Sequence, residues 1–285
     1  MPTTELTREN TRKIVQTKEW KIEINEAGSG HPIIMLHGTG PGATGWTNFS
    51  PNLIALAQKY RVIALTFPGW GLSDPVEPGK EPQRNTNARA VKLVMDELGI
   101  EKAAIVGNSM GGVALQQFIT DYPERLSHFV TMGTSAPGVG MFVPGGLTEG
   151  IRILTETYAD PTLENFRRLV RIMVYDSSFV TDELCEARSK AALANKTHLE
   201  NWLSPKRNGG HGGDAMVAAL TSAKTPALLI HGRDDRVVPM ENTMRLNAMM
   251  QNSRALIFNH CGHWAQIEHA GEFNWILDNF IAHNL

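Results

Sequence analysis

Short apolar runs of β type alternate with segments of helical periodicity along this chain, and this alternation limits its fold more than any other feature. The predicted strands are residues 20–28, 32–38, 60–69, 102–109, 126–133, 225–232 and 255–263. Between two of them, residues 88–99 repeat apolar side chains at helical spacing. Strands that alternate with helices form a parallel sheet covered by helices. The sequence therefore predicts an α/β fold with a mostly parallel central sheet.

The alternation is interrupted once, between the strand that ends near residue 133 and the one that begins near residue 225. This interval contains three predicted helices, at residues 146–160, 161–176 and 181–203. A helical insertion between core strands forms a cap over the strand ends, where α/β sheets bind ligands. We therefore divide the chain into a first core part at 1–135, a cap at 136–208 and a second core part at 209–285.

Composition favours a small-molecule ligand over a polymeric partner. The 285 residues are 42% hydrophobic and 20% charged, with a formal net charge of -2. This balance gives no general attraction to nucleic acid or to anionic lipid. The N-terminus lacks the apolar segment of a signal peptide, and no run approaches the ~18 apolar residues of a membrane span, so we expect a cytosolic protein. Cys185 and Cys261 form no metal or disulfide pattern and are interpreted as reduced packing residues.

The stretch Gly107-Asn-Ser109-Met-Gly111 has the spacing G-x-S-x-G between a predicted strand and a predicted helix. In this setting the motif is a nucleophile elbow, in which small residues permit a strained turn that lifts the serine hydroxyl above the sheet. Ser109 is therefore the candidate nucleophile.

A serine hydroxyl needs a histidine base and an acid that orients the histidine. On this architecture the order is serine, acid, histidine. Asp234 and Asp235 directly follow one predicted strand, and His263 follows the next. His260 and His269 are the nearest competitors for the base, and we interpret both as local hydrogen-bonding residues.

The glycine-rich stretch HGTGPGATGW at residues 37–46 has the spelling of a dinucleotide-binding loop, but the acidic residue expected about 20 positions later is missing, because the next strand ends in Thr66 and Phe67. A serine hydrolase instead needs two backbone N–H groups that face the developing oxyanion. Thr39 and Met110 are the candidates for this oxyanion hole, and His37 is expected to brace the loop.

Together these residues resemble the α/β-hydrolase superfamily, and the finer match is to the meta-cleavage product hydrolases. That family splits carbon–carbon bonds in ring-fission products of aromatic catabolism. The matching stretches are HGTGPGATGWTNF, NARAVKLVMDELGI, VGNSMGG, GRDDRVVP and CGHWAQIEHAGEF, spread from about residue 30 onward. The glycine-rich stretch and Cys-Gly-His-Trp-Ala-Gln are the more specific of these signals.

The resemblance implies a role for each matching residue. It makes Ser109 the nucleophile, His263 the base and Asp235, not Asp234, the orienting acid. It also implies that Arg188 of the cap binds the carboxylate and dienolate oxygen of the substrate. The remaining predicted substrate-binding residues are Asn48, Asn108 and Trp264.

The family mechanism implies hydrolysis of 2-hydroxy-6-oxo-hexa-2,4-dienoate-type compounds after ketonisation, with no cofactor and no metal. The family also implies a homo-oligomer, a dimer or larger. Two alternatives stay open from the sequence: a carboxylesterase or lactonase on the same fold, and a hydrolase-fold receptor with little turnover. The sequence leaves open which substituent at C6 the cap accepts.

Overall fold

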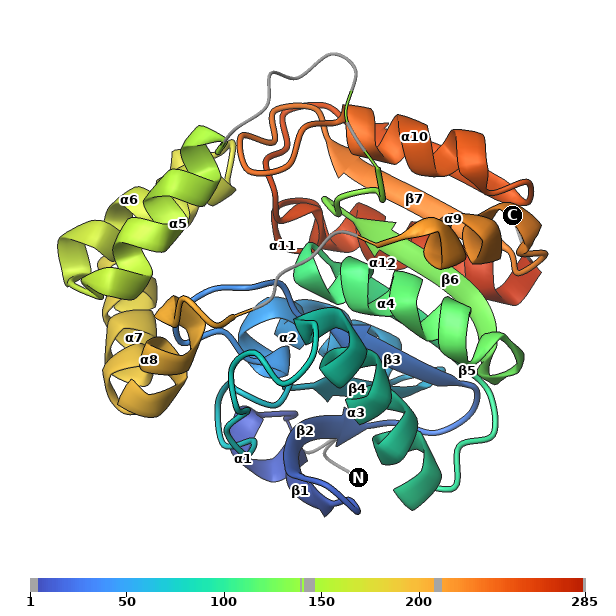
Figure 1. The fold of residues 1–285 in the computed structure, drawn as a ribbon, viewed down its shortest axis with the longest axis horizontal. Coiled ribbons are helices and arrows are strands. Elements are labelled where there is room, and N and C mark those ends of the chain that lie inside the picture. The colour runs from blue at the N-terminus through green and yellow to red at the C-terminus, as the bar shows by residue number, and fades with distance from the viewer. Residues whose placement is uncertain (1–4, 139, 141–146, 208–211, 284–285) are drawn as a thin grey trace.

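The fold is that of a computed structural model, which describes residues 5–138, 140, 147–207 and 212–283. Its centre is an eight-stranded sheet in the order β1-β2-β4-β3-β5-β6-β7-β8 (Figure 1). The strands are β1 (Arg12–Gln16), β2 (Lys21–Ala27), β3 (Pro32–Leu36), β4 (Arg61–Leu65), β5 (Ala103–Asn108), β6 (Leu126–Met132), β7 (Ala227–Gly232) and β8 (Ser253–Phe258). All seven predicted strands are present, so the α/β prediction is confirmed.

The direction of the strands places the loops that carry the predicted site residues at the same end of the sheet. Strands β3 to β8 run parallel to one another, whereas β2 pairs antiparallel with both of its neighbours, β1 and β4. The loops after β3, β5, β7 and β8 therefore emerge together. The chain order reverses between β3 and β5, and this switch point is where open α/β sheets bind ligands.

Apolar side chains alternate along the central strands and form one cluster on each face of the sheet. One cluster joins the sheet to α3, α4, α9 and α10, and the other joins it to α2 and α12 (Figure 1). The helices of the core are α1 (Arg8–Thr11), α2 (Gly45–Leu56), α3 (Gln83–Glu97), α4 (Met110–Asp121), η1 (Pro123–Arg125), α9 (Asp214–Ser222), α10 (Glu241–Met249), α11 (Ala265–Glu268) and α12 (Ala270–His283).

Among the described residues, the first four α-helices after β6 lie to one side of the core, and we call them the cap after their predicted role (Figure 1). They are α5 (Glu149–Ala159), α6 (Leu163–Met173), α7 (Asp182–Leu193) and α8 (Lys196–Leu203), with the short helix η2 (Ser177–Phe179) between α6 and α7. The prediction of a single helix at 181–203 is wrong in one respect. The helix is interrupted at Asn195, whose φ of -127° and ψ of 63° are not helical. The second predicted boundary of the cap, 208/209, lies outside the described residues.

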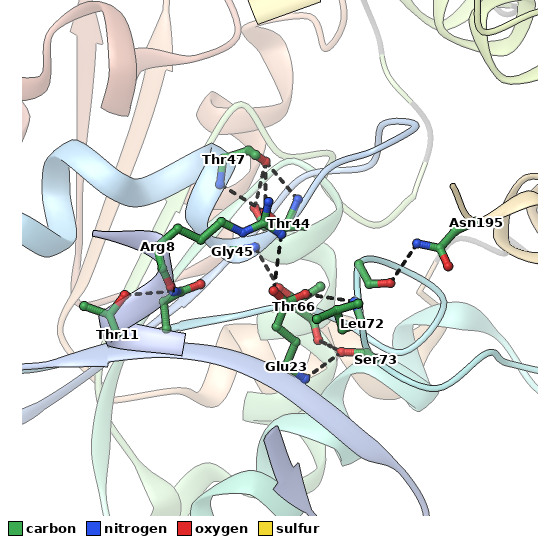
Figure 2. A network of polar contacts seen from close by, with 12 residues as sticks. Arg8, Thr11, Glu23, Thr44, Gly45, Thr47, Thr66, Leu72, Ser73 and Asn195 are labelled. Atoms are coloured by element: carbon green, nitrogen blue, oxygen red, sulfur yellow. Dashed lines mark hydrogen bonds and ion pairs between the residues drawn. The ribbon is translucent and has the colours of Figure 1, made fainter. Parts of the chain in front are cut away.

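A polar network joins the N-terminal segment, the loop after β4 and the cap (Figure 2). The Glu23 side chain is buried, accepts a hydrogen bond from the Leu72 amide at 2.9 Å and pairs with Arg8 at 3.3 Å. The Asn195 amide donates to the Gly71 carbonyl at 3.0 Å. The break between α7 and α8 is therefore a point where the cap is bonded to the core. Among the described residues, no helix is both long and apolar enough to cross a bilayer.

Candidate active site

Ser109 lies at the turn between β5 and α4 and has the strained backbone expected of a nucleophile elbow. Its φ is 52° and its ψ is -115°, in a region that non-glycine residues rarely adopt. The turn needs Gly111, because a Cβ there would lie 2.1 Å from the Leu36 carbonyl oxygen. Met110 is the first residue of α4, so its N–H is one of those that a helix leaves without an internal partner.

Asp235 and His263 form a direct hydrogen bond at the ends of β7 and β8. His263 Nδ1 lies 2.7 Å from Asp235 Oδ2. Because a carboxylate only accepts, Nδ1 carries the proton and Nε2 is left as the basic nitrogen. Burial alone would raise the pKa of Asp235, but the charge of His263 and the hydrogen bonds from His231 and His263 lower it well below its usual range. Asp235 is therefore an acceptor for His263 at neutral pH.

The elbow and the histidine loop are held together at the end of β6. The Asn108 amide donates to the carbonyl oxygens of Met132 at 3.3 Å and His263 at 3.2 Å. Gly133 faces both partners of the acid–base pair, since a Cβ there would lie 2.9 Å from His263 Nδ1 and 3.1 Å from Asp235 Oδ2. Ser109, Asp235 and His263 thus come from three loops that meet beside β6.

The loop after β3 approaches the elbow closely. A Cβ on Gly38 would lie 2.7 Å from Asn108 Oδ1 and 3.2 Å from Ser109 Cβ. His37 Nε2 accepts from the Phe67 amide at 3.0 Å, so its Nδ1 carries the proton and donates to the Gly38 carbonyl at 2.8 Å. Burial lowers the pKa of His37 to about 4, so the ring is neutral at neutral pH. The predicted bracing role of His37 is confirmed.

Arg188 is a buried cation without a hydrogen-bond partner for two of its nitrogens. It lies on α7 with 4% of its surface exposed, and Nε and Nη2 have no partner among the described residues. Its guanidinium lies 4.6 Å from the ring centroid of Trp264, the residue after His263. Burial lowers the pKa of Arg188 to about 10, which still leaves it charged at neutral pH. An unpaired buried cation is costly, and its geometry suits an anion that arrives from solution.

The two predicted asparagines are buried and engaged in local contacts. Asn48, in the first turn of α2, donates to the Thr44 carbonyl at 3.2 Å and lies 3.4 Å from Thr47 Oγ1. Asn108 makes the two backbone bonds described above, and its Oδ1 is buried without a partner. Both side chains stabilise the loops around the elbow, and their contact with substrate stays a prediction.

Sequence reasoning missed three residues that contact predicted site residues or the loops that carry them. His231 Nε2 lies 3.2 Å from Asp235 Oδ2. Glu268 accepts from the amides of Tyr175, Asp176 and Gly262. Tyr158 of the cap contacts Thr39. A histidine at the end of an apolar strand was a usable signal for His231, whereas the other two depend on contacts between distant segments. Both cysteines are free and buried, as expected, and the described residues contain no cluster of three metal-ligating side chains.

Comparison with known proteins now identifies the chain. A family model described as the alpha/beta hydrolase fold matches residues 31–270. A 2-hydroxy-6-oxononadienedioate/2-hydroxy-6-oxononatrienedioate hydrolase from Paraburkholderia xenovorans is 43% identical over 289 residues, which cover 98% of both chains. This chain belongs to the meta-cleavage product hydrolases of the α/β-hydrolase superfamily.

Solved structures of meta-cleavage product hydrolases agree with this assignment. A meta-cleavage product hydrolase from Pseudomonas fluorescens IP01 superimposes with a TM-score of 0.85 at 30% identity, over 96% of this chain and 98% of that one. The 2-hydroxy-6-oxo-6-phenylhexa-2,4-dienoate hydrolase from Rhodococcus sp. strain RHA1 gives 0.79 at 26% identity, over 94% and 98%. The predicted fold, family and enzyme class, a serine-type hydrolase of carbon–carbon bonds, are confirmed.

Proposed function

We propose that Ser109, His263 and Asp235 are the nucleophile, base and orienting acid of this meta-cleavage product hydrolase. The bond of 2.7 Å between His263 Nδ1 and Asp235 Oδ2 supports the second and third roles. The positive φ of Ser109 supports the first. Thr39 and Met110 supply the oxyanion-hole N–H groups, and residues 136–208 act as the cap.

The observation that carries the substrate class is the buried guanidinium of Arg188, two of whose nitrogens have no hydrogen-bond partner in the part of the chain that the structure describes. A carboxylate or a 2-hydroxy-dienolate can accept two hydrogen bonds from one guanidinium and neutralise its charge. Such a contact fixes one end of the substrate, so that its distant ketone reaches Ser109. Trp264 supports the guanidinium from one side, while Asn48 and Asn108 complete the polar half of the site.

The chemistry proceeds in four steps. Loss of the 2-hydroxyl proton and protonation at C5 first convert the dienol to its keto form. Ser109 Oγ then attacks the C6 ketone while His263 Nε2 takes its proton, and the resulting oxyanion accepts hydrogen bonds from Thr39 and Met110. Cleavage of the C5–C6 bond leaves the acyl group on Ser109 and the electron pair on the dienoate fragment, which takes up the proton held by His263. Water hydrolyses this ester to a carboxylic acid, and no step requires a metal or a cofactor.

The relatives suggest which C6 substituent to test first. Several curated relatives at 40–43% identity are named for a nonadienedioate, a substrate with a second carboxylate at C9. We propose that this chain accepts that dioate and releases a 2-hydroxy-2,4-dienoate and butanedioate. We also propose that the protein is cytosolic and forms a homo-oligomer. Light scattering after size-exclusion chromatography would test the oligomeric state.

The deciding experiment follows the loss of visible absorbance of the nonadienedioate and of a 6-phenyl analogue, with a p-nitrophenyl ester in parallel. We expect rapid bleaching of the dioate, slower bleaching of the phenyl analogue and slow ester cleavage. Ser109→Ala should still bind the dioate but abolish turnover. Ester cleavage without bleaching of either dienoate would contradict the proposal and favour a carboxylesterase.

A further inference from the structure

Two aromatic residues of the cap contact the loop that carries the predicted oxyanion donor. The Tyr158 hydroxyl, on α5, lies 3.2 Å from Thr39 Oγ1 and accepts a hydrogen bond from the Gly40 amide at 3.1 Å. The Trp202 indole N–H, on α8, donates to the same Thr39 oxygen at 3.1 Å. The side chain of Thr39 and the amide that follows it are therefore both held by the cap.

The two aromatic rings also hold each other in place. They stack with centroids 3.6 Å apart and an interplanar angle of 3°. Tyr158 is only 2% exposed, and burial raises its pKa to about 12, so its hydroxyl stays protonated at neutral pH. A core residue completes the arrangement, because the Trp70 indole N–H donates to the Gly40 carbonyl at 3.1 Å and approaches the Tyr158 oxygen at 3.3 Å.

We infer that Tyr158 and Trp202 are positioning residues, which set the orientation of the Thr39 N–H toward the oxyanion. The inference rests on the oxyanion-hole role proposed above. An N–H group contributes to catalysis only when it faces the position of the oxyanion before the reaction begins. The loop has small residues on both sides of Thr39, so its own side chains provide little restraint, whereas the cap holds Thr39 Oγ1 and the Gly40 amide.

This inference gives the cap a second task besides enclosing the substrate. A cap that only selects substrates affects the dienoate and leaves a small ester unaffected. A cap that also orients an oxyanion donor affects every substrate whose carbonyl is attacked by Ser109. The two possibilities therefore differ in their effect on an ester that makes no contact with Arg188.

The test is Tyr158→Phe, which removes the hydroxyl and retains the ring that stacks on Trp202. Misplacement of one oxyanion donor lowers rates by about 10- to 100-fold. We expect kcat to fall by this factor for both the dienoate and the p-nitrophenyl ester, with KM within about twofold of the native value. Rapid kinetics should retain the ketonisation phase and slow the cleavage phase.

Tyr60→Phe is the matched control, because it also removes a buried phenol hydroxyl, bonded to Asp278 at 2.8 Å on the core. This control should keep the native kcat for both substrates. A comparable loss of thermal midpoint in the two variants, with a loss of kcat in Tyr158→Phe alone, separates positioning from general destabilisation.

Thr39→Val gives a second, independent measurement, since it removes the anchored oxygen and retains the backbone N–H. Because the contact between Tyr158 and Thr39 is lost in either single variant, the double variant should lose less activity than the product of the two single losses. Full multiplication of the two losses would overturn the inference. So would a Tyr158→Phe kcat within twofold of native, or a loss confined to the dienoate. If the native chain bleaches no dienoate, the proposed substrate fails, but the ester rates still test the positioning role.

Discussion

At the scale of single residues, Arg188 shows a conflict between stability and function. A buried cation without an anion destabilises a fold, and even a buried ion pair can be replaced by apolar side chains of similar volume with a gain of about 1–4 kcal/mol. The guanidinium of Arg188 is supported only by the face of Trp264 among the contacts of the described residues. Its retention in the cap is therefore best explained by a bound anion.

Arg188→Met should consequently raise the free energy of unfolding by about 1–4 kcal/mol. The same change should lower kcat/KM for the dienoate by about 100-fold, because a bidentate charge-assisted contact is lost, and should leave the p-nitrophenyl ester nearly unaffected. Denaturant unfolding and steady-state kinetics measure the two effects. Arg171→Met, at an exposed position of the neighbouring helix α6, should change neither. Equal losses on both substrates would rule out the carboxylate anchor.

The sequence predicted Ser109, Asp235 and His263 because their order and their places after strands follow from the fold itself. It could not predict Tyr158, whose hydroxyl contacts a residue 119 positions away. It also could not indicate that Asn108 binds the His263 carbonyl, because the contact depends on how two loops meet. Local patterns indicate chemistry, whereas the packing of distant segments determines which side chains support it.

At the scale of elements, the errors of prediction have identifiable causes. The predicted single helix at 181–203 is interrupted at Asn195, whose side chain donates a hydrogen bond to the Gly71 carbonyl in a core loop. Strand β1 was missed because four of its five residues are exposed, so it lacks the apolar run that marks the central strands. Tertiary contacts override the local pattern in the first case, and an edge position weakens it in the second.

Glu268, at the end of α11, links the cap to the histidine loop. Its Oε2 accepts from the amides of Tyr175 at 2.6 Å and Asp176 at 3.1 Å, and its Oε1 accepts from Gly262 at 2.7 Å. His263 adds a second link, since its amide donates to the Met173 carbonyl at 2.7 Å. These four hydrogen bonds therefore hold the segment after α6 against the loop that carries His263.

Glu268→Gln should weaken this link, because a neutral amide presents one acceptor oxygen where the carboxylate presents two. We expect a loss of about 1–3 kcal/mol in the free energy of unfolding. We also expect a fall of about tenfold in kcat, since a small displacement of His263 impairs proton transfer from Ser109. Glu186→Gln, at an exposed position of α7, is the matched control. Native kcat in Glu268→Gln would mean that the loop keeps its geometry without the carboxylate.

At the scale of the whole molecule, the cap and the core share an apolar cluster. Its cap members include Phe166 and Leu169, and its core members are Val237 and Trp264 from the loops after β7 and β8. Val237 lies two residues after Asp235, and Trp264 directly follows His263. The cluster therefore couples the packing of the cap to the loops that carry the acid–base pair, and the proposed cap should not unfold separately.

Calorimetry of Phe166→Ala tests this coupling. The side chain is fully buried, so its truncation should cost about 3–5 kcal/mol. Because cap and core share the cluster, we expect a single thermal transition at a lower midpoint. Phe273→Ala is the matched control, with an equally buried phenylalanine that packs α12 against the opposite side of the molecule's core. It should lower the midpoint of a single transition in the same way. If Phe166→Ala instead melts in two steps, with the second at the native midpoint, cap and core are independent units. The cap then does not stabilise the loops around Asp235 and His263.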